Sequence, residues 1–210
     1  MTMQNSLTIG VLALQGDYEA HAQALTEAGA TPKLVRTPVE LASVQGLILP
    51  GGESTTFLKF LEREGLLDSL RAYVEVHPTF GTCAGCILLA KEVLQPAQAS
   101  LGVLDATVER NAYGRQVDSS IQMGKTFLPG GPLEMVYIRA PRIQKTGKDV
   151  EILAERDGFP VLVRQHNILA ATFHPELSAD RRVHRYFVQM VEEFSTAHAG
   201  PARHKNPRKA

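Results

Sequence analysis

The sequence is short of cysteine and of net charge, and it contains no long hydrophobic run. Only Cys83 and Cys86 are present, too few and too close together for a disulfide framework, which indicates a reducing, cytoplasmic environment. Lys+Arg and Asp+Glu both number 22, so the balance of charge gives no reason to expect nucleic acid or an anionic membrane as a partner. No apolar run is long enough to span a membrane and no signal-like segment opens the chain, so we expect neither membrane insertion nor export.

Strand-like and helix-like segments alternate through the first half of the chain. Short apolar segments predict strands, and Asp17 and Ser54 or Thr55 are candidate helix caps; the expected strands are 7–14, 33–36, 46–49 and 79–82. This repeated pattern favours a parallel, doubly wound sheet. From about Thr107 strand candidates follow one another with little helix between them, namely 107–110, 133–139, 150–155, 159–165 and 168–173. We therefore predict an α/β, three-layer sandwich: a mostly parallel central sheet flanked by helices, with added antiparallel strands.

A last amphipathic helix, beginning at Ser178 or Asp180, is expected to end the folded part of the chain, with His184 on its polar face. A single domain is therefore predicted over residues 1–197. The segment 198–210 is basic, contains two prolines and has no apolar pattern. We expect this tail to be disordered.

Cys83 lies in the turn Gly-Thr-Cys-Ala-Gly, between a strand and a helix-like stretch. At such a junction the helix dipole and the free N–H groups favour thiolate over thiol. A free cysteine is most often a buried structural residue, but Gly81 and Gly85 suit a strained turn rather than core filling. The turn therefore favours a nucleophile. Because Cys86 completes a C-x-x-C pattern, a redox pair is an alternative; a zinc site would need further ligands, and we expect no metal and no cofactor.

His174 is the strongest candidate for a general base among the seven histidines. It ends an apolar strand, precedes a proline and has the carboxylate of Glu176 two residues further on. His21, in the first helix, and His184 have no such context. Cys83, His174 and Glu176 together are typical of a nucleophile, a general base and a residue that orients the base.

The segment Pro-Gly-Gly-Glu-Ser at 50–54 follows a predicted strand. It lacks the lysine of a phosphate-binding loop, and on its own it could be only a turn and helix cap. Two glycines at the carboxyl end of a parallel strand also leave backbone N–H groups free to face a ligand. An acyl-transfer site needs such donors for its oxyanion, together with the N–H that follows the nucleophile, here that of Ala84.

With these motifs the chain resembles the class I, or triad, glutamine amidotransferases, and more narrowly the glutaminase subunits of pyridoxal 5'-phosphate synthase. The resemblance extends from about Thr8 to Phe194. It rests on the following segments: Ile-Gly-Val-Leu-Ala-Leu-Gln-Gly at 9–16, Leu-Pro-Gly-Gly-Glu-Ser-Thr-Thr at 49–56, Phe-Gly-Thr-Cys-Ala-Gly at 80–85, Val-Glu-Arg-Asn-Ala-Tyr-Gly-Arg-Gln at 108–116, Ile-Arg-Ala-Pro at 138–141 and Phe-His-Pro-Glu-Leu at 173–177.

The resemblance implies a flavodoxin-like fold and hydrolysis of L-glutamine to L-glutamate and ammonia through a glutamyl thioester. It implies a Cys83–His174–Glu176 triad, an oxyanion hole from the N–H groups of Gly52 and Ala84, and glutamine contacts from Gly51, Gly52, Glu53, Arg110, Ile138 and Arg139. A guanidinium suits the α-carboxylate of glutamine, and Glu53 could receive the α-ammonium group or hold its loop. The resemblance also implies a partner, a (β/α)8-barrel synthase subunit that receives the ammonia through a channel.

Three alternatives stay open at this point. A cysteine peptidase can use the same nucleophile turn, and a non-catalytic binding or redox module would not need Cys83 as a nucleophile. A glutaminase that serves a different synthase would share every catalytic motif.

Overall fold

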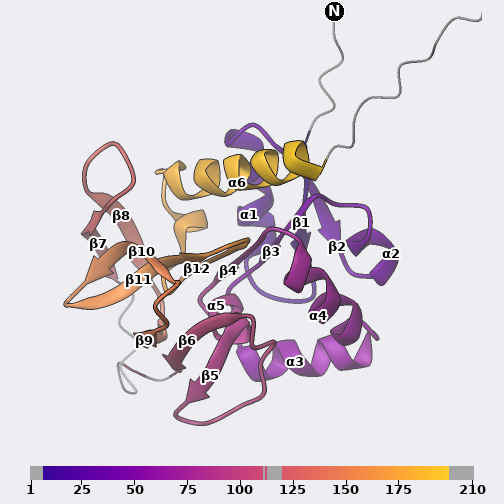
Figure 1. Cartoon of the computed structure of the whole chain (residues 1–210), viewed down its shortest axis with the longest axis horizontal. Helices are drawn as coiled ribbons and strands as arrows, with labels where there is room; N and C mark the ends of the chain where they lie inside the picture. Colours follow the sequence, from indigo (N-terminus) through magenta and orange to yellow (C-terminus); the bar gives the residue numbers. More distant parts are fainter. Residues whose placement is uncertain (1–6, 111, 113–119, 199–210) are drawn as a thin grey trace, which may run out of the picture.

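A nine-stranded sheet forms the centre of the computed structural model, in the order β2-β1-β3-β4-β12-β11-β10-β7-β8 (Figure 1). The structure describes residues 7–110, 112 and 120–198, so the predicted tail lies, apart from His198, outside the described residues. The sheet is parallel from β2 through β12 and antiparallel from β11 onward. The bounds of its strands are β1 (Thr8–Leu12), β2 (Thr31–Val35), β3 (Gly46–Leu49), β4 (Thr79–Thr82), β7 (Ser120–Thr126), β8 (Leu133–Tyr137), β10 (Glu151–Arg156), β11 (Phe159–Gln165) and β12 (Ile168–Ala171).

Helices cover both faces of the parallel part of the sheet (Figure 1). On one face lie α1 (Tyr18–Glu27) and α6 (Arg182–His198), which share a buried apolar cluster with the sheet. On the other face lie α3 (Ser54–Arg63), α4 (Leu67–Val76) and α5 (Ala84–Leu89), which bury their apolar residues in a second cluster. The other helical elements of the described residues are the short helix α2 (Pro38–Leu41) and the 3₁₀ turn η1 (Pro175–Leu177). The predicted three-layer α/β fold is confirmed.

The strands in the middle of the sheet are buried on both faces, which is why they appear in the sequence as continuous apolar runs. Every residue of β3, β4 and β12 is buried. Parallel strands covered by helices on both sides show this pattern, whereas a strand with one wet face alternates. Alternation marks β7, where exposed and half-buried residues follow one another.

A second, three-stranded sheet was not predicted. It consists of β5 (Ala90–Leu94), β6 (Leu104–Glu109) and β9 (Arg142–Thr146). The helix-like stretch that follows Cys83 forms α5 and ends at Leu89, because the chain turns into β5 at Ala90. Of the strands expected to extend the main sheet antiparallel, β8, β10 and β11 do so, whereas β12 runs parallel to β4 and β6 belongs to the second sheet. Strand β7, which also extends the main sheet antiparallel, was not predicted.

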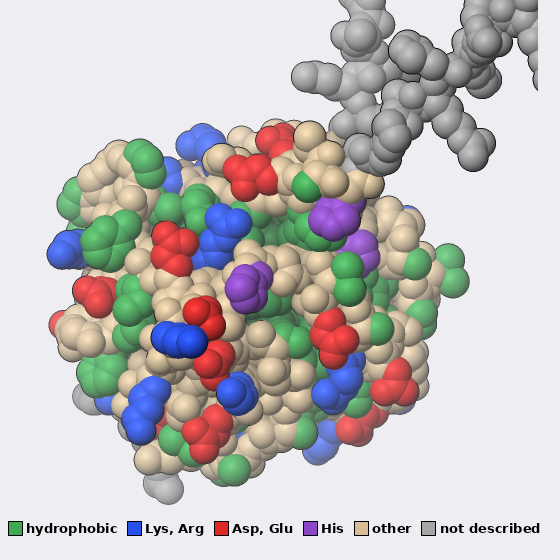
Figure 2. Space-filling view, viewed as in Figure 1, with side chains coloured by type: hydrophobic (Ala, Val, Ile, Leu, Met, Phe, Trp, Pro, Cys, Tyr) green, Lys and Arg blue, Asp and Glu red, His purple; other side chains and the backbone are tan. Residues whose placement is uncertain are grey.

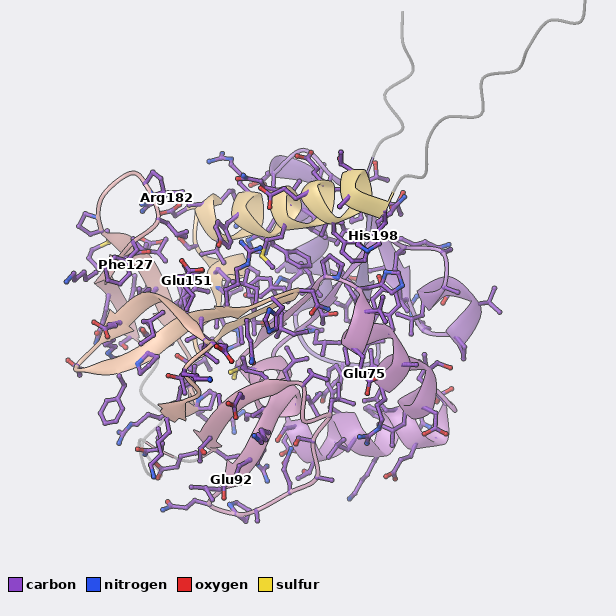
Figure 3. All side chains as sticks on the ribbon, viewed as in Figure 1. Glu75, Glu92, Phe127, Glu151, Arg182 and His198 are labelled. Carbon is purple, nitrogen blue, oxygen red and sulfur yellow. The ribbon has the colours of Figure 1, made fainter. Side chains whose placement is uncertain are left out.

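Arg182 joins the start of α6 to the loop between β7 and β8 (Figure 3). Its guanidinium donates hydrogen bonds to the backbone oxygens of Pro129, Gly131 and Pro132, at 2.6 to 3.1 Å. It also pairs with Asp180, whose Oδ1 accepts the backbone N–H of Arg182. Asp180 therefore holds the first turn of α6, one of the two starts expected from the sequence.

Charges of both signs are interspersed on the face seen in Figure 2, in keeping with the zero net charge. In the described part of the chain, no helix combines the length and the apolar character that crossing a bilayer requires.

Candidate active site

Four segments meet at the carboxyl ends of neighbouring parallel strands. Residues 15–17 follow β1, residues 50–53 follow β3, Cys83 follows β4, and His174 comes shortly after β12. The strand order 2-1-3-4 reverses direction at β1, and ligands bind outside the carboxyl ends of strands at such a switch point. The topology therefore brings together the motifs that are far apart in the sequence.

Cys83 lies on a strained turn between β4 and α5. Its φ of 47° and ψ of −101° are rare for a residue with a side chain, and its N–H donates to Ala171 O at 2.9 Å. A Cβ on Gly81 would lie 2.6 Å from the backbone of Gly85, and a Cβ on Gly85 would lie 2.1 Å from Leu49 O. The glycines on both sides of the cysteine are thus required by close backbone packing, as the sequence indicated.

His174 and Glu176 form a buried pair next to Cys83. His174 Nδ1 lies 2.8 Å from Glu176 Oε1, and both residues are 4% exposed. The backbone N–H of His174 donates to Val136 O at 2.8 Å, which ties the histidine to β8. The imidazole is therefore held at one end by a carboxylate while its other side faces the cysteine.

The electrostatics of this pair favour an imidazolium beside a carboxylate. Burial disfavours the charged imidazole, but hydrogen bonds with Cys83 and Glu176 outweigh burial and raise the pKa of His174 to about 10. Burial alone would raise the pKa of Glu176, but the interaction with His21 and the hydrogen bond with His174 outweigh burial and lower that pKa. A cationic imidazole next to the sulfur is the counter-ion that a thiolate nucleophile needs.

Gly51 and Gly52 pack against the candidate base and against the loop after β1. A Cβ on Gly51 would lie 2.5 Å from His174 Cε1, and a Cβ on Gly52, whose φ is +138°, would lie 2.9 Å from Gln15 Nε2. Gln15 Nε2 also donates to Glu53 O at 2.9 Å. Two side-chain-free positions thus let the loop after β3 approach the imidazole closely.

Glu53 caps α3, a role that the sequence had suggested for Ser54 or Thr55. Its carboxylate accepts the backbone N–H groups of Thr55 and Thr56. It also pairs with Arg110, with Nη2 2.9 Å from Oε1. Burial disfavours the charged carboxylate, but the hydrogen bonds from Thr55 and Thr56 prevail and lower the pKa of Glu53 to about 2. Of the two roles considered for Glu53, the structure shows that it holds its loop.

The capping role of Glu53 predicts a pH-dependent stability. Its pKa falls from 4.5 in the unfolded chain to about 2, so its stabilising contribution is present above pH 4.5 and is lost as the pH falls toward 2. After a discount for the half-exposed side chain, we expect Glu53→Gln to lower the free energy of unfolding by about 1 kcal/mol at pH 7. Urea denaturation at pH 7, 4 and 2.5 should show this difference closing with acid.

Glu192→Gln, at an exposed position in the interior of α6, is the matched control, since it removes the same charge away from a helix cap. A loss of stability in Glu53→Gln that does not change with pH would contradict the assignment.

A pocket of about 280 Å³ opens above the cysteine. Seven of the residues predicted for the site line it: Gly52, Glu53, Cys83, Arg110, Ile138, Arg139 and His174. The other three lie around it: Gly51 packs against His174, Glu176 behind His174, and Ala84 is buried in the first turn of α5. Asp17, Ser54 and Ile87 also line the pocket and were not predicted for it. Their only signal was nearness to a predicted site segment: Asp17 directly follows 9–16, Ser54 lies within 49–56, and Ile87 comes two residues after 80–85.

His184 is not on the polar face of α6, as expected from the sequence, but fully buried. Its Nε2 lies 3.1 Å from Nδ1 of His21, which is also fully buried. The spacing held the signal, because His184 lies three residues before Phe187 and seven before Val191, both of them buried. His21 likewise lies three and four residues before the buried Ala24 and Leu25.

Cys86 is fully buried in α5, and burial raises the pKa of its thiol to about 12. Cys83, in contrast, lines the pocket. Both cysteines are free. Cys86 is therefore a core residue of α5, while Cys83 faces the space where a substrate would bind.

Among the described residues, Asp17, His174 and Glu176 have donor atoms within 4.8 Å of one another, close enough to share a metal ion. His174 and Glu176 already satisfy each other through their hydrogen bond. The donor set therefore suits acid–base chemistry better than metal binding.

Comparison with known proteins agrees with this geometry. The SNO glutamine amidotransferase family is matched over residues 11–193. The chain belongs to the SNO glutamine amidotransferase family. A pyridoxal 5'-phosphate synthase subunit PdxT from Koribacter versatilis is 58% identical over 185 residues, 88% of this chain and 96% of that protein. The PdxT of Thermotoga maritima is 51% identical over 188 residues, 89% of this chain and all of that protein.

A crystal structure of a glutamine amidotransferase superposes with a TM-score of 0.81. It is 48% identical in sequence, and the match covers 88% of this chain and 98% of that one. The expected glutamine amidotransferase family and fold are thus confirmed for this SNO family member. Part of the segment 108–116 that supported the resemblance, residues 111 and 113–116, lies outside the described residues.

Proposed function

We propose that this SNO family member is the glutaminase subunit of a pyridoxal 5'-phosphate synthase, and that it hydrolyses L-glutamine through Cys83, His174 and Glu176. The observation that carries the proposal is the placement of Cys83 and His174 together in one small pocket that is also lined by Arg110 and Arg139. The choice of synthase rests on the PdxT relatives, which are named as subunits of pyridoxal 5'-phosphate synthase and match over nearly their whole length.

The chemistry begins from the ion pair in which His174 holds the proton as an imidazolium, oriented and stabilised by Glu176, and Cys83 is the thiolate. The thiolate attacks the side-chain amide carbon of glutamine, and His174 returns the proton to the leaving ammonia. Water then hydrolyses the glutamyl thioester and releases glutamate. The same imidazole activates that water.

Each oxyanion along this route needs hydrogen-bond donors that are already in place. We assign this role to the backbone N–H groups of Gly52 and Ala84, on the two sides of the Cys83 turn. Gly52 has a φ of +138°, and with Gly51 before it the loop can rotate a peptide plane. A loop of this kind can complete the oxyanion hole when the partner docks, which would make the isolated subunit a weak enzyme.

Glutamine binding is assigned to Gly51, Gly52, Glu53, Arg110, Ile138 and Arg139. Arg110 is positioned by its ion pair with Glu53. Arg139, among the described residues, has no carboxylate within ion-pair distance, so its guanidinium is free for the α-carboxylate of glutamine. Its φ of 46° is a strained conformation, of the sort that accumulates at binding sites.

The ammonia released must avoid protonation in water to remain a nucleophile. We therefore propose that it passes through a channel into a (β/α)8-barrel synthase subunit, which uses it to build pyridoxal 5'-phosphate. No cofactor is needed for the glutaminase half of this reaction.

Glutamate release from L-glutamine, measured with and without an added synthase subunit, tests the proposal. Turnover should rise at least tenfold with the partner, and asparagine, one methylene shorter, should be a poor substrate. Co-purification with the barrel subunit would distinguish this synthase from other users of ammonia. Absence of turnover in both conditions, with Cys83 still reduced, would contradict the glutaminase assignment.

A further inference from the structure

A buried pair of histidines lies directly behind the candidate triad. His21 of α1 and His184 of α6 are both 0% exposed, and His21 also reaches the side chains of Thr82 and Glu176. Buried imidazoles are uncommon, and neither of these two is part of the pocket. Their role is therefore to be sought in what they contact.

The carboxylate of Glu176 is only half used by the triad. Oε1 is 2.8 Å from His174 Nδ1, whereas Oε2 is buried and, in the described part of the chain, has no hydrogen-bond partner at ordinary geometry. His21 Nε2 lies 3.4 Å from that oxygen. A buried carboxylate oxygen without a donor is costly, so a hydrogen on this nitrogen would stabilise the ionised form.

Two arrangements of hydrogens are possible along the histidine pair, since one hydrogen lies between His21 Nδ1 and His184 Nε2. If His184 Nε2 donates it, His21 carries its own hydrogen on Nε2, facing Thr82 Oγ1 at 3.0 Å and Glu176 Oε2 at 3.4 Å. His184 Nδ1 is then a lone-pair acceptor, which is the cheaper group to leave buried without a partner.

The opposite arrangement fails twice. If His21 Nδ1 donates to His184, the hydrogen of His184 lies on Nδ1, which is buried and has no acceptor among the described residues. His21 Nε2 then turns a lone pair toward the carboxylate of Glu176. Donation from His21 Nδ1 therefore leaves a buried donor unsatisfied and brings two acceptors together, whereas donation from His184 Nε2 avoids both costs.

We propose that His21 is a positioning residue for Glu176, and that His184 fixes the tautomer of His21 in which Nε2–H faces the second oxygen of that carboxylate. This inference rests on the proposed triad and extends it inward by two residues. The resulting chain of contacts runs from His184 through His21, Glu176 and His174 to Cys83. Both outer histidines are neutral in this chain of contacts. Burial is the main cause that lowers the pKa of each below its ordinary value.

The charged groups around His21 come from three parts of the fold. Glu176 and His174 face His21 from the segment around η1. Asp17 is the residue directly before α1. Arg181 directly precedes α6, and His184 lies in the first turn of that helix. Glu176 and Asp17 favour a protonated His21, while His174 and Arg181 oppose it, and burial dominates. His21 therefore acts as a neutral donor.

The tautomers can be measured directly, by long-range ¹H–¹⁵N NMR on the full chain labelled with ¹⁵N-histidine. We expect His21 and His184 both to carry their hydrogen on Nε2. A hydrogen on Nδ1 of His21 would overturn the inference, whether or not the protein turns over glutamine.

Kinetics on the complex with the synthase subunit give the second test. His21→Leu should lower kcat about ten- to a hundredfold with little change in KM, the usual cost of one lost hydrogen bond to a charged group. Because Glu176 becomes easier to protonate, the acid limb of the profile should move to higher pH by about one unit. His21→Gln, whose amide can donate to Glu176, should recover most of the activity.

Leu25→Ala is the matched control, because it opens a cavity in the same helix without touching Glu176. It should lower the melting temperature but leave kcat and the pH profile unchanged. Equal losses in His21→Leu and His21→Gln, or an unshifted acid limb in a folded His21→Leu, would reduce His21 to a packing residue.

The pH dependence of Cys83 alkylation by iodoacetamide, measured for the wild type, His21→Leu and His21→Gln, compares the acid limbs without requiring turnover. A wild-type complex with the synthase subunit that releases no glutamate refutes the proposed function, whereas the tautomers and the alkylation profile still decide the role of His21.

Discussion

Cys83→Ala is expected to abolish glutamate release, with turnover reduced at least about a thousandfold. Without the sulfur no thioester can form, and Ser54, a hydroxyl residue that also lines the pocket, donates to Gln98 Oε1 at 2.8 Å rather than to His174. The residue is 6% exposed and alanine fits the same space, so the fold and binding of the synthase partner should persist. Steady-state glutamate release on the complex, with a melting curve for each variant, measures both.

Cys86→Ala is the matched control for this experiment. It removes an identical thiol three residues away, but from a fully buried position in α5 where the thiol stays protonated. It should retain turnover, and alkylation of the wild-type chain should label the peptide that contains Cys83 at that residue. Residual turnover above a tenth of wild type in Cys83→Ala would remove Cys83 from the mechanism.

Gly85→Ala is expected to have the largest effect on stability, about 3 kcal/mol or more. The added Cβ would lie 2.1 Å from the backbone oxygen of Leu49, on β3, and a backbone atom in the middle of a sheet cannot move aside as a side-chain end can. Helix α5 would have to shift away from β3 and carry the turn of Cys83 with it. Thermal melts should show a midpoint lower by about 6–12 °C, together with lost turnover.

Gly65→Ala separates this clash from the general cost of replacing glycine. Gly65 has a φ of +63° but nothing within 4 Å of the position of an added Cβ. Only backbone strain should appear there, about 1 kcal/mol, with turnover kept. Equal effects at the two glycines would show that close packing of α5 on β3 does not constrain the nucleophile turn.

The residues predicted for the site come together in the structure because local sequence decides where each of them lies relative to its strand. Apolar runs such as 46–49 and 79–82 specify strands buried on both faces, and in a parallel sheet their carboxyl ends share one edge. Residues that directly follow such runs, including Cys83, then meet without further information. The glycines of the turn carry their own signal, since only glycine tolerates the backbone contacts there.

The second sheet could not be read in the same way. Strands β5 and β9 lack a continuous buried run: β5 is buried at two of its five positions and β9 at one of its five. β6 also pairs with β9, which lies more than thirty residues further along the chain, and local pattern does not reveal such a distant partner. Local pattern therefore placed β6 in the wrong sheet and missed β5 and β9, and it also missed β7 of the main sheet, which has no buried position.

The sequence by itself determined the α/β class, the family, and the residues proposed to react and to bind glutamine, because each rests on short segments with strong local constraints. Only the tertiary structure decided what surrounds them. In the structure Glu53 caps α3 and pairs with Arg110, and His184 and His21 lie in contact with each other behind Glu176. Whether a histidine on an amphipathic helix faces solvent or another imidazole depends on the helix packed against it, here α1 against α6, and no local pattern contains that contact.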